Sequence, residues 1–168
     1  MIATILVAAA VTLLVLGVGG VMTTVGAWYH GLRKPWWNPP DYVFGPAWTV
    51  ILALAATAGV LAWSNAPESS RLLIIGLFAA NIFFHMLWSP LFFNMKRPDW
   101  ALIEAPFLWA SVVALMIGLS PYSSAAVWLL APYLVWVTFA IYLNWTIVKL
   151  NAPFGGAVER PAEPRGAS

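Results

Sequence analysis

Five long apolar runs, separated by short polar segments, dominate the chain. A helix needs about 20 mostly apolar residues to cross a hydrocarbon core of about 30 Å, and each run has that length. The runs cover roughly residues 2–27, 43–65, 72–94, 100–119 and 122–150. Because backbone groups in lipid must find hydrogen-bond partners within their own segment, the runs are expected to be helices. The pattern therefore predicts an all-α integral membrane protein, a bundle of five transmembrane helices.

The division between the last two runs depends on a short polar turn. Residues 105–148 carry no charge, and this stretch is about twice the length of one span. Ser120, Pro121, Ser123 and Ser124 lie within it and predict the turn. The first run has no basic segment before it and is longer than the apolar part of a signal peptide, so we interpret it as a span. The chain thus divides into a membrane domain, residues 1–151, and a flexible polar tail, residues 152–168.

Composition agrees with a membrane location and excludes several function classes. Hydrophobic residues make up 62% of the 168 residues and charged residues 8%, whereas a soluble domain needs more charge to cover its surface. Eight basic and six acidic groups are too few for a nucleic-acid-binding surface. The chain has no cysteine, which excludes disulfides, thiolate nucleophiles and thiolate metal sites.

The basic residues predict which way the bundle faces. With five spans, the C-terminus and the connections after the first and third runs lie on one side. That side holds Arg33, Lys34, Lys96, Arg97, Lys149, Arg160 and Arg165, whereas the other side holds Arg71. The positive-inside rule then places the C-terminus and the 28–42 loop on the cytoplasmic face.

The loop between the first two runs is rich in tryptophan and proline. Residues 33–48 contain four of the 13 prolines and three of the 11 tryptophans. Pro39 and Pro40 lack a backbone donor and disfavour helix in the preceding residue, which keeps the loop extended and stiff. Indole rings such as those of Trp28, Trp36 and Trp37 suit the boundary between membrane and water. Composition alone leaves two interpretations open, an aromatic belt and a cap over a ligand.

The order of these residues resembles one known family, the TspO/translocator-protein family of tryptophan-rich sensory proteins. Its first loop and second-helix entry are similar to Trp28-Tyr29-x-x-Leu32-x-Lys34-Pro35-x-Trp37-x-Pro39-Pro40, followed by Val43-Phe44-x-Pro46-x-Trp48-Thr49. Later similar blocks are Trp88-Ser89-Pro90-Leu91-Phe92-Phe93 with Lys96-Arg97, and Pro132-Tyr133-Leu134-x-Trp136 with Ala140, Leu143-Asn144 and Leu150-Asn151. The resemblance covers roughly residues 26–151 and keeps its blocks in order.

The resemblance implies a five-helix bundle, often a homodimer, that binds tetrapyrroles such as protoporphyrin IX. Some members of the family also bind sterols and benzodiazepine-type drugs. Because the family's first loop closes over a pocket, the 28–42 loop is expected to be a lid. The expected ligand is protoporphyrin IX or haem, and no cofactor is required. The expected ligand-binding residues are Trp28, Tyr29, Trp37, Pro40, Trp48, Asn81, His85, Trp88, Trp136, Ala140 and Asn144.

Helical spacing groups some of these residues independently of the resemblance. At 100° per residue, Asn81, His85 and Trp88 lie within about 60° of one another. Polar groups inside a membrane face a cavity or hydrogen-bond to a neighbouring helix, and both interpretations stay open here. The family usually has Gln and Asn where this chain has Asn81 and His85, so the ligand preference is in question. An imidazole at position 85 can ligate haem or make binding sensitive to pH.

The last apolar run carries a second candidate face. Tyr133, Trp136, Ala140 and Asn144 follow the spacing of one helix face, a pattern more typical of packing than of a ligand site. The resemblance favours the pocket wall for two of them, Trp136 and Ala140, together with Trp48. A proposed sterol-contact pattern near Tyr142 is one residue too long, and sterol binding is not predicted.

Small residues at a spacing of four favour close helix contacts. Gly76 with Ala80, and Gly20 with Thr24, form such pairs. The pairs predict either a homodimer contact or packing within one chain. Neither interpretation follows from the sequence alone.

The leading functional hypothesis is a membrane receptor or sensor that binds porphyrins and regulates tetrapyrrole metabolism or a stress response. Two alternatives are porphyrin degradation driven by light or oxygen, which is reported for several family members, and transport of tetrapyrrole or sterol. Asp41, Asp99 and Glu104 lie near predicted helix ends, and no Ser-His-Asp set emerges, so no catalytic residue is assigned. The odd number of spans and the lack of a visible inverted repeat weigh against an alternating-access carrier.

Overall fold

The computed structural model of the chain describes residues 1–155, and every regular element in this part is a helix. The elements are α1 (Ile2–Met22), α2 (Ala27–Gly31), α3 (Asp41–Asn65), α4 (Glu68–Ser89), η1 (Pro90–Asn94), α5 (Pro98–Leu119) and α6 (Ser124–Asn151). Five helices, one of them α4 continued by η1, are long and apolar enough to cross a membrane. The predicted five-helix all-α membrane architecture is thereby confirmed. Most of the expected tail, residues 156–168, lies outside the described residues.

The helix boundaries differ from the predicted ones at the start of three helices and at the end of the first helix. α3, α4 and α5 begin two to four residues earlier than the apolar runs, at Asp41, Glu68 and Pro98. The sequence explains the shift, because acidic side chains are favoured in the first turn and proline is favoured at the first helical position. α1 is shorter than expected and ends at Met22. The next residues lead into the separate short helix α2.

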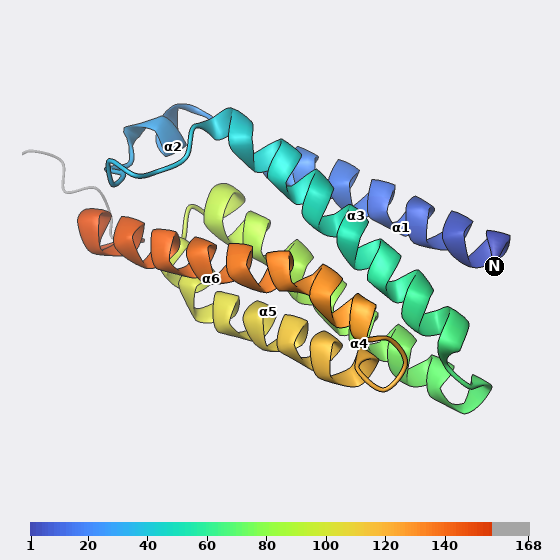
Figure 1. Cartoon of the computed structure of the whole chain (residues 1–168). Helices are drawn as coiled ribbons and strands as arrows, with labels where there is room; N and C mark the ends of the chain where they lie inside the picture. Colours follow the sequence, from blue (N-terminus) through green and yellow to red (C-terminus); the bar gives the residue numbers. More distant parts are fainter. Residues whose placement is uncertain (156–168) are drawn as a thin grey trace, which may run out of the picture.

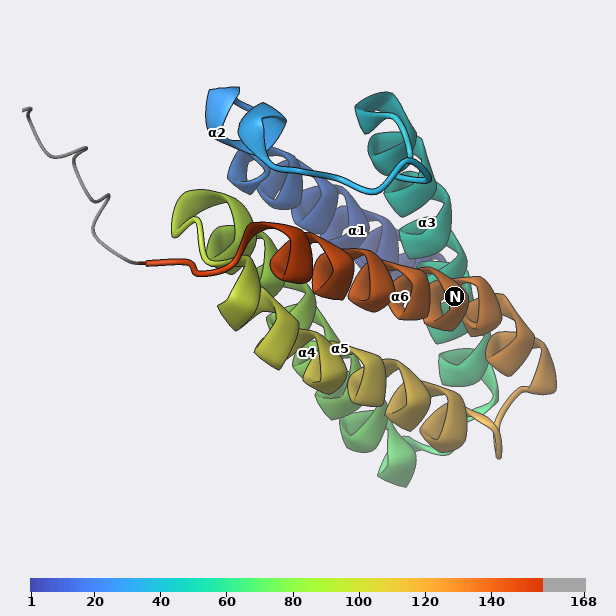
Figure 2. The ribbon, with the colours of Figure 1, turned by 90° about the vertical axis from the view of Figure 1, so that its left-hand side faces the viewer.

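Four of the long helices form the core of the bundle. α5 packs against both α4 and α6, and α3 packs mainly against α6 and α1 (Figures 1 and 2). Ala58 and Ala62 of α3 are completely buried, and such small side chains allow close approach of neighbouring helices. Tyr133 of α6 and Leu115 of α5 fill the centre.

α1 stands at the edge of the bundle. Its contacts are mostly with α3, with fewer to α4 and η1 (Figure 1). Val15 is its one buried side chain. The helix is apolar on all sides, and so lipid covers most of it.

A π-helical turn ends the fourth helix. Pro90 has no N–H to donate to the preceding turn, and the Met95 N–H donates to the Pro90 carbonyl at 2.9 Å in the wider pattern. Such turns recur at functional sites because they redirect side chains. Here the turn presents Phe92 and Phe93 at the end of the bundle that carries the 28–42 loop.

One end of the bundle gathers three segments that are distant in the sequence. The 28–42 loop with α2, the link between η1 and α5, and the end of α6 all lie there (Figure 1). These segments carry Arg33, Lys34, Lys96, Arg97 and Lys149. We call this end the loop end. Its collected positive charge matches the arrangement expected from the span count.

Candidate ligand-binding site

A pocket of about 430 Å³ opens inside the loop end of the bundle. Its walls come from α1, α3, α4 with η1, and α6, with two residues of α5 at the base. The volume lies within the range of about 300–1,000 Å³ that is usual for small-molecule sites. The loop side contributes Val25, Tyr29 and Asp41. The pocket is therefore positioned between membrane helices and beneath the 28–42 loop.

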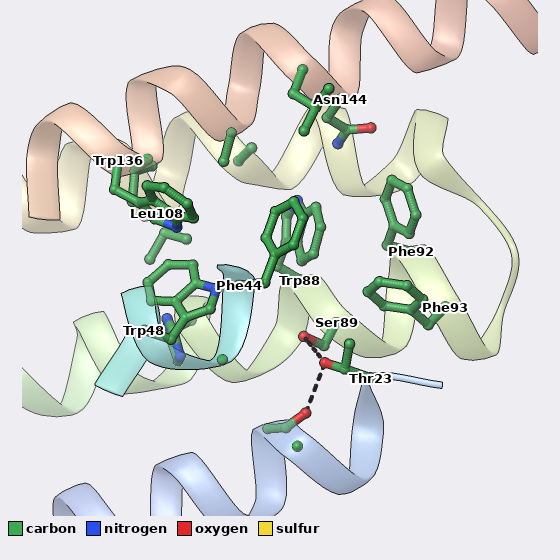
Figure 3. Close-up of a pocket in the computed structure, with 18 of the residues that line it drawn as sticks. Thr23, Phe44, Trp48, Trp88, Ser89, Phe92, Phe93, Leu108, Trp136 and Asn144 are labelled. Carbon is green, nitrogen blue, oxygen red and sulfur yellow. Dashed lines mark hydrogen bonds between the residues drawn. The ribbon is translucent and has the colours of Figure 1, made fainter. Parts of the chain in front are cut away.

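Aromatic rings make up much of the wall. Trp48 of α3 lies with its ring centroid 6.3 Å from that of Trp136 on α6, at 84° between planes. Phe44, one turn before Trp48, meets Trp136 edge-on at 5.9 Å. On the opposite side, Trp88 stacks on Phe92 at 4.9 Å (Figure 3). Flat aromatic surfaces on two sides favour a flat apolar ligand between them.

His85 lies in the pocket wall and is held by a buried hydrogen-bond chain. Its Nδ1 is 3.2 Å from the Tyr133 hydroxyl, which is also 3.3 Å from Oδ1 of Asn81. The amide nitrogen of Asn81 donates to Ser111 Oγ at 2.9 Å, and Ser111 donates to the Leu108 carbonyl at 2.6 Å. This series of hydrogen bonds joins α4, α5 and α6.

The donors and acceptors in this series of hydrogen bonds determine the tautomer of His85. Since Ser111 uses its proton on the Leu108 carbonyl, it accepts from Asn81, which leaves the Asn81 oxygen to accept from Tyr133. The Tyr133 oxygen then accepts a proton from Nδ1 of His85. The neutral imidazole therefore keeps its lone pair on Nε2. His85 can accept a hydrogen bond or ligate a metal through that nitrogen.

Replacing Asn81 by alanine is expected to lower the free energy of unfolding by about 1–2 kcal/mol, because Tyr133 and Ser111 lose their buried partner. Thermal unfolding in detergent measures the change. Asn65→Ala is the matched control, since the Asn65 side chain is exposed and bonds only to its own helix at Leu61. Equal melting temperatures for the two variants would contradict the structural role of Asn81.

Two further polar residues in the wall are occupied by helix contacts. Thr23 at the end of α1 donates to the Gly19 carbonyl at 2.8 Å and lies 3.3 Å from the Ser89 hydroxyl of α4 (Figure 3). With its amide oriented to satisfy both ends, Asn144 donates to the Pro98 carbonyl and accepts from the Leu102 N–H, each at 3.1 Å. Its amide therefore joins α6 to α5 even though the residue borders the pocket.

The 28–42 loop is fastened to the end of α6. The Asn151 side chain accepts from the Arg33 N–H and donates to the Arg33 carbonyl, both at 2.8 Å, in the manner of a strand pair. Trp37 stacks on Tyr142 with 5.2 Å between centroids and 14° between planes. Segments more than 100 positions apart in the sequence are thus joined at the loop end of the bundle.

Tyr29 of α2 is buried at the inner side of the loop. The Lys34 ammonium lies 3.6 Å from the centre of its ring. Burial, and then the negative charge of Asp41, raise the pKa of Tyr29 to about 12. Its phenol consequently remains neutral at physiological pH and can donate a hydrogen bond into the pocket, which it lines.

The structure brings most of the predicted site residues together. Seven of them line the pocket: Tyr29, Trp48, His85, Trp88, Trp136, Ala140 and Asn144. Four lie outside it. Asn81 stands behind His85 in the hydrogen-bond chain, Trp28 packs edge-on against Phe92, Trp37 lies on Tyr142, and Pro40 precedes α3 at an exposed position. Their role as ligand-binding residues stays a prediction.

The sequence did not identify the α1 wall. Val15, Leu16, Gly19, Gly20 and Thr23 line the pocket, but α1 has no polar face from which this could be read. The sequence could have identified Phe44 as a pocket residue, since it lies four residues before Trp48 and so on the same helix face. Among residues 1–155, no group of three His, Asp or Glu side chains could hold a metal ion.

Comparisons with known proteins point to one family. Residues 5–150 match the sequence model of the TspO/MBR family. The chain is similar to the tryptophan-rich protein TspO of Chlorobaculum tepidum, with 38% identity over 74% of this chain and 80% of that protein. It is 37% identical to the tryptophan-rich sensory protein of Cereibacter sphaeroides over 79% of this chain and 85% of that protein. The human translocator protein is 29% identical over 80% of each.

Proposed function

Because the chain belongs to the TspO/MBR family of membrane proteins, we propose that it is a receptor or sensor that binds porphyrins in the pocket beneath the 28–42 loop. Binding would regulate tetrapyrrole metabolism or a stress response. One similar protein carries the name sensory protein and another the name translocator protein, which fits a role in signalling or movement of a small molecule. Five helices long and apolar enough to span a membrane support a binding site within the bilayer.

The observation that carries the proposal is the arrangement of Trp48, Trp88 and Trp136 around one pocket. Their rings come from three different helices and bring flat faces to a cavity that small apolar side chains such as Ala140 leave open. A porphyrin is a flat π-system, and each ring that stacks on it stabilises binding by about 1 kcal/mol beyond burial. The few polar groups in the wall suit the propionates and ring nitrogens at its edges.

Tryptophan fluorescence tests the proposal directly. Purified protein in lipid nanodiscs is titrated with protoporphyrin IX, haem and a sterol, and quenching of the tryptophans near the pocket is recorded. We expect saturable quenching by the porphyrins. Quenching that never saturates, or that equals the effect on an unrelated membrane protein, would contradict the proposal.

His85 gives the pocket a specific preference within the porphyrin class. Its free Nε2 lone pair supports ligation of the iron of haem, whereas a metal-free porphyrin makes no such bond. His85→Ala is expected to change the Soret band of bound haem and to weaken haem binding about tenfold, while the affinity for protoporphyrin IX changes little. Absorption titrations with both ligands measure this difference. An unchanged Soret band in the variant would exclude the iron bond.

The orientation proposed for the bundle places the loop end in the cytoplasm. Arg33, Lys34, Lys96, Arg97 and Lys149 lie at that end, and the positive-inside rule places such groups on the cytoplasmic side. The pocket would then exchange ligand with the cytoplasm through the 28–42 loop. The loop acts as its lid in this arrangement.

We also propose a homodimer through the lipid-facing side of α4. Gly76 and Ala80 are exposed, and the space beside Gly76 is open, whereas Gly59 and Gly118 are filled by side chains of the same chain. A second copy can approach closely there. Gly76→Leu is expected to abolish dimers in bilayer cross-linking without lowering thermal stability, and Gly17→Leu on the open side of α1 is the control. Cross-linking that is equal in both variants would remove this interface.

A further inference from the structure

A buried carboxyl on α5 has no partner within the described part of the chain. Glu104 is 6% exposed, and neither of its carboxyl oxygens has a hydrogen-bond partner among residues 1–155. It lies six residues after Pro98, or about 9 Å from the start of α5 along the helix axis. This position is near a helix end, as predicted, and within the candidate span. An acidic group at this depth is costly unless something pairs with it.

Glu104 borders a groove that is separate from the porphyrin pocket, and protein atoms cover both of its carboxyl oxygens. The groove runs between α4 and α5, whose axes lie side by side in Figures 1 and 2, and has a volume of about 560 Å³. Its wall consists of Phe84, Leu87, Leu91, Trp100, Ile103, Glu104 and Phe107. Ile103 and Phe107 are more than half exposed, so the groove is open to the acyl chains. Glu104 is its one charged member.

Arg97, the basic residue just before α5, binds other groups than Glu104. The Arg97 Nε donates to Asp99 at 2.8 Å, and the guanidinium lies 4.3 Å from the centre of the Trp100 ring. The neighbouring Tyr133 hydroxyl is used by Asn81 and His85. Within residues 1–155 these contacts leave Glu104 without a cation or donor. A group from outside the chain can supply either.

The rings beside Glu104 favour a cation as that group. Phe84 and Phe107 are stacked at 5.9 Å with 19° between planes, and Phe107 belongs to the turn that follows Glu104. Aromatic faces together with a carboxyl attract an ammonium, which offers three N–H donors to the two unpartnered oxygens. An alcohol would satisfy Glu104 less well than an ammonium, because it offers one donor and no charge. The apolar length of the groove then suits an alkyl chain.

We propose that the α4/α5 groove is a second binding site, which takes a lipophilic primary amine from the bilayer. The unpartnered Glu104 side chain turns toward the groove and pairs with the ammonium. The alkyl chain lies along Leu87, Leu91 and Ile103. The site is independent of the porphyrin pocket, because its wall shares no residue with that pocket. Charge complementarity within hydrocarbon provides the selectivity for amines.

A bromine-tipped ligand pair tests the site. The protein in nanodiscs is titrated with 11-bromoundecylamine and with 11-bromoundecanol, because bromine quenches nearby tryptophans such as Trp100. We expect saturable quenching by the amine and about 10- to 100-fold weaker binding of the alcohol. Equal binding of amine and alcohol, or no saturation by the amine, would overturn the proposal in the unmodified protein.

Variants separate the carboxyl from the groove itself. Glu104→Gln keeps the shape and should weaken amine binding about 10- to 100-fold without affecting the alcohol. Glu104→Asp keeps the charge and should retain the preference for amine. Protoporphyrin binding by each variant reports whether it is folded. An amine affinity unchanged in a folded Glu104→Gln protein would overturn the proposal. A second copy of the protein that covers the groove and excludes the amine would overturn it as well.

Discussion

Replacing Trp48 by alanine should weaken the binding of protoporphyrin IX by about 10- to 100-fold. The Trp48 ring lies edge-on to three other rings, with centroids 4.6 Å from His85, 5.9 Å from Tyr133 and 6.3 Å from Trp136. Its removal takes away one stacking surface and the burial of a large apolar ring against the ligand, together about 1.5–3 kcal/mol. Fluorescence quenching or equilibrium absorption titration in nanodiscs measures the dissociation constant.

Two control variants make the Trp48 result specific. Trp128 of α6 is 77% exposed, so Trp128→Ala removes an indole that faces lipid and should leave the affinity unchanged. Trp48→Phe keeps an aromatic face and should recover part of the loss. An affinity for porphyrin that falls equally in Trp48→Ala and Trp128→Ala would show that the pocket is not the site.

Releasing the 28–42 loop from α6 should speed the dissociation of bound porphyrin. Asn151→Ala removes both hydrogen bonds to the Arg33 backbone. Each bond stabilises the closed position by about 0.5–1.5 kcal/mol, so the loss of two bonds should raise the dissociation rate about 5- to 150-fold. The rate is measured by mixing loaded protein with excess acceptor vesicles and following the return of tryptophan fluorescence. The association rate should rise as well, because the lid opens more often.

A graded pair of substitutions separates the latch from general damage. Asn151→Asp still accepts from the Arg33 N–H but cannot donate to its carbonyl, so its dissociation rate should lie between those of the native protein and Asn151→Ala. Asn65→Ala at the opposite end of the bundle is the control. A dissociation rate that is the same in all four proteins would mean that the loop does not cover the pocket.

The sequence predicted the spans well because their signal is strong and local. Runs of about 20 apolar residues have few alternatives in a membrane, and proline with an acidic residue marks the starts of α3, α4 and α5. It was less informative about which side chains meet the pocket. Helix periodicity put Trp136 and Ala140 on one face, but the choice between packing and ligand depended on the resemblance.

Some residues singled out in the sequence lie away from the pocket wall. Glu104 was predicted near a helix end and lies in the second turn of α5, six residues after Pro98. Trp37 and Trp28 were expected to bind the ligand, and in the structure they pack on Tyr142 and Phe92. Side-chain directions in a loop depend on its turns and contacts, and no periodicity in the sequence records them.

The thinly attached first helix has a consequence for the range of ligands. Gly19 and Gly20 leave part of the α1 side of the pocket without side chains, and Val15 is the one buried side chain of this helix. An outward shift of α1 would exchange contacts with protein for contacts with acyl chains at a small cost in free energy. Under the proposed function, such a shift would widen the pocket for thicker ligands, and the affinity would then depend on bilayer thickness and lateral pressure.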